Sequence, residues 1–258
     1  MTMTPDSPDL LETFRGGRLQ VAYQGQWDLH AAWDAGFVTS PPVAVEALSR
    51  WSHPEIGAVS PEEFIPLAEK GGFLDALDAD VLARAAAQVA TWKAAGRDVG
   101  LSVNAAPSHF SSEYAETAIR ISQSLDLDLS ALTIEITEAP APQLRESMRT
   151  ALERLRAEGV SISVDDFGAG GTSLEMLSGL PIDEVKLDRS LVQRDDADAD
   201  AIVHDVVGLA RERDWRVVAE GIETTKDLER SVLRGCHRGQ GFLWGPAVDA
   251  VAMELALG

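Results

Sequence analysis

The sequence predicts an α/β fold, a TIM-like (β/α)8 barrel, and three observations favour it. Seven short hydrophobic segments each hold an acidic or amide side chain at or near their ends. Helix-like stretches of about 10 to 20 residues separate most of these segments, which is the spacing of a repeated strand–helix unit. The length of 258 residues and the 45% hydrophobic content fit one barrel of ordinary size.

The strands follow from short aliphatic and β-branched runs. A first strand is predicted at residues 19–24, and a long connection over residues 25–42 leads to the second. The strands with polar ends span residues 43–51, 100–105, 132–138, 160–168, 184–190, 216–223 and 238–243. Residues 1–15 are expected to form a frayed lead-in, because the start of the chain is polar and contains proline, and residues 16–258 form one domain.

The helices carry local boundary signals. Ser60 precedes Pro61 and two glutamates, which predicts a helix with a serine cap, a proline at its first position and acids in its first turn. In the stretch 142–158 apolar residues recur on one stripe, and Gly159 ends it. Further helices are predicted at residues 77–95, 107–126, 197–214, 224–234 and 247–256.

Alternation within the strands predicts where the polar groups point. In the segment after Gly159, Ser161, Ser163 and Asp165 share one strand face and oppose the apolar residues between them. Three other predicted strands alternate in the same way. An interior built only for stability would be filled with Val, Ile and Leu. The polar faces therefore predict a functional site inside one end of the barrel.

Composition excludes several kinds of partner. The net charge of −20 disfavours nucleic-acid polymers and anionic membranes, because both attract basic surfaces. Cys236 is the only cysteine, so no internal disulfide is possible and a reducing compartment is expected. The sequence shows no signal peptide and no apolar run near the ~18 residues of a membrane span. We expect a cytoplasmic protein.

The polar strand ends bring together ligands for hard cations. The converging side chains are the acids Glu46, Glu135, Asp165, Asp166 and Glu220, with the amide Asn104 and the amine Lys186. So many carboxylates cannot all stay ionised without compensation. Oxygen ligands without clustered His or Cys favour Mg²⁺ or Mn²⁺ over zinc. Two such cations would nearly balance the charge, which predicts a two-metal phosphoryl hydrolase that activates a water molecule.

These positions carry, in chain order, the motifs of a known family. The motifs are Glu46-Ala47-Leu48, SVN ending at Asn104, EITE at 135–138, DDFG at 165–168, KLD at 186–188, AEGIE at 219–223 and QGF at 240–242. With them, the chain resembles the EAL-domain cyclic di-GMP phosphodiesterases over essentially its whole length. The resemblance implies a barrel with an antiparallel first strand. It also implies hydrolysis of one phosphodiester bond of cyclic di-GMP, giving linear pGpG, at the C-terminal mouth of the barrel.

The resemblance implies a role for each acid and for the lysine. The positions that match metal ligands are Glu46, Asn104, Glu135, Asp165, Asp166 and Glu220. Glu46 and Lys186 also match residues of the catalytic machinery, and Lys186 corresponds to the amine that orients the attacking water. Glu220 matches the acid that serves either as the general base or as a ligand of the second metal.

Other positions match substrate contacts and supports. Gln24, Leu48 and Arg50 match residues that bind the substrate. Arg50 lies two residues beyond Leu48 on the same strand face, where its guanidinium could meet a phosphate. Gln240 matches an amide at the last strand that supports the site and contacts the substrate. Glu138 matches the acid that anchors the loop after DDFG.

The implied cofactors are two Mg²⁺ or Mn²⁺ ions in each active site. Ca²⁺ is expected to bind and inhibit, because its longer and looser coordination would misplace the reacting water. The implied partners are cyclic di-GMP and a second copy of the chain in a homodimer. An unidentified regulatory protein is a further possible partner.

The chain departs from the family pattern in places that leave other functions open. Gly25 and the long segment 25–42 replace a YQP motif and a short connection, Gly171 replaces an aromatic residue, and His237 replaces an acid. These changes leave open a cyclic di-GMP receptor with little or no turnover. A third reading is an interaction module that uses the barrel as a scaffold. Retention of the complete acid set argues against this third reading, because an idle cluster of carboxylates is destabilising.

Overall fold

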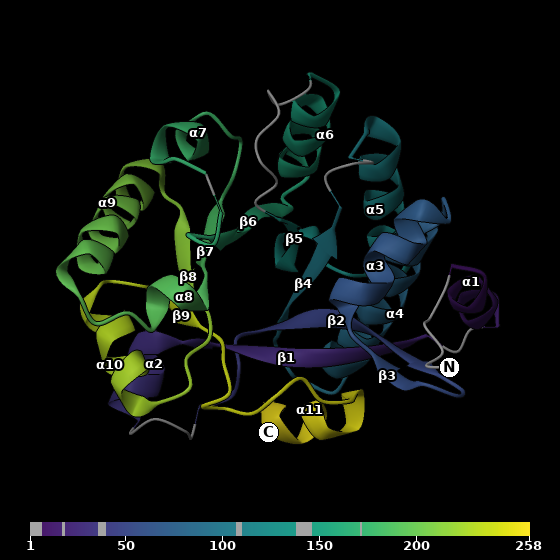
Figure 1. The fold of residues 1–258 in the computed structure, drawn as a ribbon, viewed down its shortest axis with the longest axis horizontal. Coiled ribbons are helices and arrows are strands. Elements are labelled where there is room, and N and C mark those ends of the chain that lie inside the picture. Colours follow the sequence, from purple (N-terminus) through teal and green to yellow (C-terminus); the bar gives the residue numbers. More distant parts are fainter. Residues whose placement is uncertain (1–6, 17–18, 36–39, 107–109, 138–145, 171) are drawn as a thin grey trace.

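The computed structural model describes residues 7–16, 19–35, 40–106, 110–137, 146–170 and 172–258. The barrel strands are β1 Gln20–Asp28, β2 Ala44–His53, β4 Gly100–Ala105, β5 Leu132–Thr137, β6 Ser161–Phe167, β7 Glu184–Leu187, β8 Arg216–Ala219 and β9 Arg238–Gly239. They follow one another in the order β1-β9-β8-β7-β6-β5-β4-β2, and β1 pairs again with β2 (Figure 1). This closed ring of eight strands confirms the predicted TIM-like barrel.

Strand direction places the ends of most strands at one mouth. Strand β1 runs antiparallel to both of its neighbours, β2 and β9. The pairs from β2 through β4 to β9 are all parallel, so seven strands end at the same side of the barrel. A short strand, β3 Gly57–Val59, forms a hairpin with β2 and lies outside the closed ring.

Helices cover the outside of the barrel (Figure 1). The helices that match predicted ones are α3 Pro61–Lys70, α4 Leu74–Ala94, α5 Ser112–Ser124, α6 Glu146–Ala157, α9 Ala197–Arg213, α10 Thr225–Leu233 and α11 Ala250–Leu257. Helix α3 starts where expected, and the Glu63 carboxylate accepts hydrogen bonds from the N–H and the hydroxyl of Ser60, both at 3.3 Å. None of the helices in the described ranges is long and apolar enough to cross a membrane.

The start of the chain differs from the expected frayed lead-in. Ser7–Arg15 form helix α1, and its Leu10 is completely buried. The indole N–H of Trp51 in β2 donates to the Thr13 hydroxyl in α1 at 3.2 Å, so a side-chain hydrogen bond connects the two elements. The expectation is wrong for residues 7–15, because a buried leucine and one buried hydrogen bond outweigh the polar composition of the segment.

The segment after the first strand also differs from the sequence analysis. Strand β1 continues to Asp28, beyond its predicted end at residue 24. Helix α2, Leu29–Asp34, follows directly, and the Asp28 carboxylate caps it by accepting from the Ala31 N–H at 2.8 Å. Helices α2, α7 Leu174–Ser178 and α8 Arg189–Val192, together with the 3-10 turn η2 Leu129–Ala131, are too short to show a helical period in the sequence.

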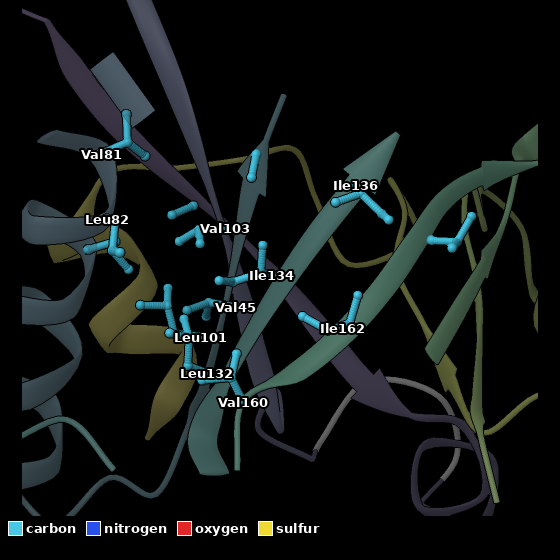
Figure 2. Close-up of a cluster of buried hydrophobic side chains, with 14 of the residues drawn as sticks. Val45, Val81, Leu82, Leu101, Val103, Leu132, Ile134, Ile136, Val160 and Ile162 are labelled. Carbon is cyan, nitrogen blue, oxygen red and sulfur yellow. The ribbon is translucent and has the colours of Figure 1, made fainter. Parts of the chain in front are cut away.

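The hydrophobic core lies between the outer face of the barrel and the helices. Figure 2 shows Val45, Val103, Ile134 and Ile162 on adjacent strands, with Leu82 of α4 facing them. All of these side chains are buried. The apolar half of each alternating strand therefore packs outward, as predicted, and the polar half is left to line the interior.

Candidate active site

The predicted polar side chains meet inside the mouth of the barrel. Parallel register sets Asn104 beside Glu135 and Thr137 beside Asp165, while antiparallel register sets Gln24 opposite Glu46. These residues come from five different strands, so the cluster exists only when the ring is closed. The remaining members of the cluster are Lys186 in β7, Glu220 directly after β8 and Gln240 directly after β9.

Lys186 lies at the centre of the cluster. Its side chain is 1% exposed. The Nζ atom lies 2.8 Å from both Glu135 Oε2 and Glu220 Oε1, 3.1 Å from Asp165 Oδ1 and 3.4 Å from Glu46 Oε2. One buried ammonium therefore contacts four carboxylates on four strands or strand ends.

Amide side chains fix the orientation of Glu46. Asn104 Nδ2 donates to Glu46 Oε1 at 2.8 Å, and Gln240 Nε2 donates to Glu46 Oε2 at 2.7 Å. Gln240 Nε2 also lies 2.9 Å from Gln24 Oε1, and Gln24 Nε2 donates to the Gly245 carbonyl at 3.4 Å. The amides predicted to touch metal or substrate thus also hold the Glu46 carboxylate in one orientation.

The acids differ in the direction of their pKa shifts. Burial favours the protonated form of Glu46, but Lys186 and the amide donors outweigh it and hold the pKa below its ordinary value. Burial, reinforced by the charge of Glu46, raises the pKa of Glu135 well above its ordinary value. Burial raises the pKa of Glu220 to about 8 and that of Asp166 to about 6, and it also raises the pKa of Asp165.

The pKa of Lys186 moves in the opposite sense to that expected for a buried amine. Burial alone would lower it. The carboxylates of Asp165, Glu135, Glu220 and Glu46 together raise it well above its ordinary value, so the amine is an ammonium. The site is accordingly an acid-rich cluster around one permanent cation.

A backbone irregularity brings two consecutive acids into the site. The register of β6 against β7 shifts between Val164 and Phe167, and Asp166 has a φ of 59°. A left-handed conformation is uncommon for a residue other than glycine and occurs mostly in Asn and Asp. The Asp166 N–H donates to Asp165 Oδ1 at 3.0 Å. Because the strand breaks its alternation here, Asp165 and Asp166 both reach the mouth.

The donors fit a pair of divalent cations. Ligand oxygens of Glu46, Glu135 and Asp165 lie within 4.8 Å of one another, and so do those of Asp165, Asp166 and Glu220. The two groups share Asp165. Among the described residues Glu135 Oε1 has no hydrogen-bond partner although it is buried, as expected for an oxygen that serves as a metal ligand. All donors are oxygens, the ligand type of Mg²⁺ and Mn²⁺.

Two hollows flank the cluster. The larger, about 500 Å³, lies on the α3–α4 side, and Glu46 and Asn104 are among the residues that line it. Its walls combine apolar Leu48 and Ile65 with polar Arg50 and Asp78. The smaller, about 260 Å³, is lined by residues including Gln24, Glu220, Gln240 and the exposed ring of Phe242. Asp166 borders both hollows.

The residues predicted to bind substrate line the two hollows. Leu48 and Arg50 line the larger hollow, and the Arg50 guanidinium donates to the Ser49 carbonyl at 2.9 Å. Gln24 and Gln240 line the smaller one. Glu138 and Gly171 lie outside the described residues.

His237 and Asp78 each accept a hydrogen bond from a backbone N–H. His237, which departs from the family pattern, accepts the Val217 N–H on its Nδ1 at 2.9 Å and is thus a support of β8. Sequence reasoning missed Asp78, whose Oδ2 accepts the Ala106 N–H at 3.3 Å beside the larger hollow. An acid between the apolar residues Leu77 and Val81 of the buried face of α4 is the signal that could have identified it.

Comparison with known proteins identifies a family that matches most of the chain. Residues 8–247 match the model of the EAL domain. Over 203 residues the chain is 43% identical to "Cyclic di-GMP phosphodiesterase PA2567" of Pseudomonas aeruginosa, a match that covers 77% of this chain and 34% of the relative. The chain spans about a third of the length of the curated relatives it matches.

Solved structures agree in fold. The structure "PaMucR Phosphodiesterase, c-di-GMP complex" is 34% identical and superposes with a TM-score of 0.84, covering 95% of this chain and 98% of that one. The structure "Klebsiella pneumoniae BlrP1 pH 8.0 calcium/cy-diGMP complex" is 26% identical with a TM-score of 0.76, covering 96% of this chain and 59% of that one. By the match along its length and the motifs around Lys186, the chain belongs to the EAL domain family.

Proposed function

We propose that this chain hydrolyses one phosphodiester bond of cyclic di-GMP, giving linear pGpG, with two Mg²⁺ or Mn²⁺ ions. The observation that carries the proposal is the complete acid set around Lys186, placed between two hollows at the barrel mouth. The names of the relatives, a cyclic di-GMP phosphodiesterase and a phosphodiesterase bound to cyclic di-GMP, support the substrate.

The metal ligands in this proposal are Glu46, Asn104, Glu135, Asp165, Asp166 and Glu220. When bound, the cations supply Lewis-acid activation of water and neutralise charge on the phosphodiester. The substrate itself demands this neutralisation, because its anionic phosphates would otherwise meet a cluster of carboxylates. Oxygen ligands in two groups that share Asp165 suit that task.

Protein groups then orient the reactants. The Lys186 ammonium, held between strands, donates an N–H towards the attacking water. Glu220 serves either as a ligand of the second cation or as the candidate base, because its carboxylate lies at the mouth 2.8 Å from the Lys186 ammonium that orients the water. The Arg50 guanidinium at the edge of the larger hollow pairs with a phosphate oxygen.

The two hollows suit a ligand with two purine bases. Leu48 and Ile65 offer an apolar surface to one base, and the nearby Asp78 carboxylate can accept from the N–H groups of a guanine edge. The exposed Phe242 ring offers a stacking surface on the other side. The scissile phosphate would then lie over the acids between them.

The direct test is incubation of the purified chain with cyclic di-GMP and Mn²⁺, followed by chromatography of the products. Metal-dependent appearance of linear pGpG is expected. Calorimetric binding of cyclic di-GMP without any product would instead assign the receptor function. Absence of both binding and product would contradict the assignment of this substrate.

A further inference from the structure

The position of Lys186 has a consequence beyond the orientation of water. Its ammonium has three N–H donors and lies within 3.4 Å of four carboxylate side chains. In the described part of the chain, the ion pairs that these four acids form all go to Lys186. The nearby Arg50 donates to a backbone carbonyl instead.

The same four acids are distributed over the two candidate metal groups. Glu46 and Glu135 belong to one group, Glu220 belongs to the other, and Asp165 belongs to both. A single ammonium thus contacts both groups at once. A divalent cation that binds to either group must share these carboxylates with Lys186 or displace it from them.

We propose that Lys186 is a built-in counter-cation of the metal site, which holds the two ligand groups together when no divalent cation is bound and competes with the incoming cation for their carboxylates. The inference rests on the metal site of the proposed function and deepens it. Two effects of opposite sign follow. The ammonium stabilises the barrel mouth in the absence of metal, because it compensates buried carboxylates. It also weakens metal binding, because it brings a positive charge next to the cation.

Lys186→Met tests both effects, because methionine has similar length and no charge. We expect the midpoint of thermal unfolding in chelator to fall by about 5 °C or more, the effect of breaking a buried pair. Calorimetry with Mn²⁺ should show a dissociation constant tighter by about tenfold or more. Lys226→Met is the matched control, since Lys226 is 70% exposed and pairs with Asp195 at 2.5 Å. It should leave both values unchanged.

The double variant Lys186→Met with Glu135→Gln keeps the test decisive if the single variant folds poorly. It removes one charge of each sign from the cluster, so it should recover at least half of the lost thermal midpoint. Rescue of the single variant by Mn²⁺ alone would also support the inference.

Two outcomes would overturn it. One is a Lys186→Met protein with the wild-type midpoint in chelator. The other is a lower midpoint with unchanged or weaker Mn²⁺ binding, which would reduce Lys186 to a structural partner. Neither readout involves turnover. A wild-type chain that binds Mn²⁺ without hydrolysing cyclic di-GMP would contradict the proposed hydrolase and leave this inference standing.

Discussion

At the level of single residues, the carboxylates of the site are compensated unequally. Glu46 accepts hydrogen bonds from Asn104, Gln240 and Lys186, and its pKa lies below the ordinary value. Glu135 is fully buried, one of its oxygens has no hydrogen-bond partner in the described part of the chain, and its pKa lies well above the ordinary value. The ionised form of Glu46 is therefore favourable in the folded protein, and the ionised form of Glu135 is unfavourable.

Neutralising Glu135 and neutralising Glu46 should change the free energy of unfolding in opposite directions. In chelator at neutral pH, Glu135→Gln should raise the free energy of unfolding, because it removes an unfavourable charge. Glu46→Gln should lower the free energy of unfolding, because it removes a well-compensated charge. Each substitution should change this free energy by about 1–3 kcal/mol. Denaturant titrations in chelator measure both values. A change of the same sign in both variants would contradict the difference in compensation.

A substitution at Glu220 should slow hydrolysis of the nucleotide and leave its binding intact. Glu220→Gln keeps the shape of the side chain but cannot accept a proton. Hydrolysis of cyclic di-GMP should fall by about 10²–10⁴, the usual contribution of a general base. Calorimetric binding of the nucleotide should remain close to that of the wild type. Equal rates of pGpG formation in the two proteins would remove Glu220 from the mechanism.

The raised pKa of Glu220 also predicts how stability depends on pH. A carboxyl whose pKa is about 8 in the folded state binds its proton more tightly there than in the unfolded chain, where 4.5 is ordinary. Its contribution is fully present below about pH 4.5 and is lost as the pH rises towards 8. In chelator, the stability of the wild type should fall over this window more steeply than that of Glu220→Gln. Parallel pH profiles of unfolding would contradict the shift.

At the level of elements, strand β1 contains Trp27, whose ring stacks on that of Trp244. The Trp27 ring folds over Gly25, where an added Cβ would lie 2.4 Å from the ring. Trp27 stacks on Trp244 with ring centroids 4.7 Å apart and an angle of 7°, and its indole N–H donates to the Ser40 carbonyl. Gly25, which departs from the family pattern, is thus explained by packing of the segment after β9 onto β1.

Gly25→Ala should consequently destabilise the fold. The methyl group would displace the Trp27 ring from its stack, and such overpacking typically costs about 1–3 kcal/mol. Gly208→Ala in α9 is the matched control, because a Cβ there meets nothing within 4 Å and alanine favours a helix. Urea unfolding followed by tryptophan fluorescence compares the two. Equal stability of Gly25→Ala and the wild type would show that the stack can shift without cost.

At the level of the whole molecule, the charge balance predicts that the proposed reaction depends on a divalent cation. The chain carries a net charge of −20. In the described residues, the ion pairs of Glu46, Glu135, Asp165 and Glu220 all go to the single ammonium of Lys186. We therefore expect an anionic dinucleotide to bind at this mouth only together with bound cations. The size and coordination of the cation then decide whether the water is placed for attack.

Turnover should appear with Mg²⁺ or Mn²⁺ and vanish in chelator. Ca²⁺ should bind, compete with Mn²⁺ and reduce pGpG formation at least about tenfold, because its longer coordination misplaces the water. Product assays with each metal, with Ca²⁺ added to Mn²⁺ as the competition control, measure this. Equal rates in Ca²⁺ and Mn²⁺ would contradict the two-metal account.

Much of this molecule follows from the sequence alone. Alternating strands with polar ends, separated by capped helices, determined the barrel, the mouth and the residues around Lys186, because strand alternation and capping are local properties of the chain. The N-terminal helix and the continuation of β1 to Asp28 were not predictable in this way. Helix α1 packs against α3 and β2, and Trp27 stacks on Trp244, so both depend on residues far along the chain that no local pattern records.

Only the tertiary structure decided how the acids are arranged in space. Strict alternation would place Asp165 and Asp166 on opposite faces of the strand. The register shift of β6 and the left-handed conformation of Asp166 instead direct both carboxylates towards the mouth. The sequence determined which side chains reach the site. Closure of the ring decided that four of them meet one ammonium, because those contacts join strands up to 140 residues apart and depend on the barrel being shut.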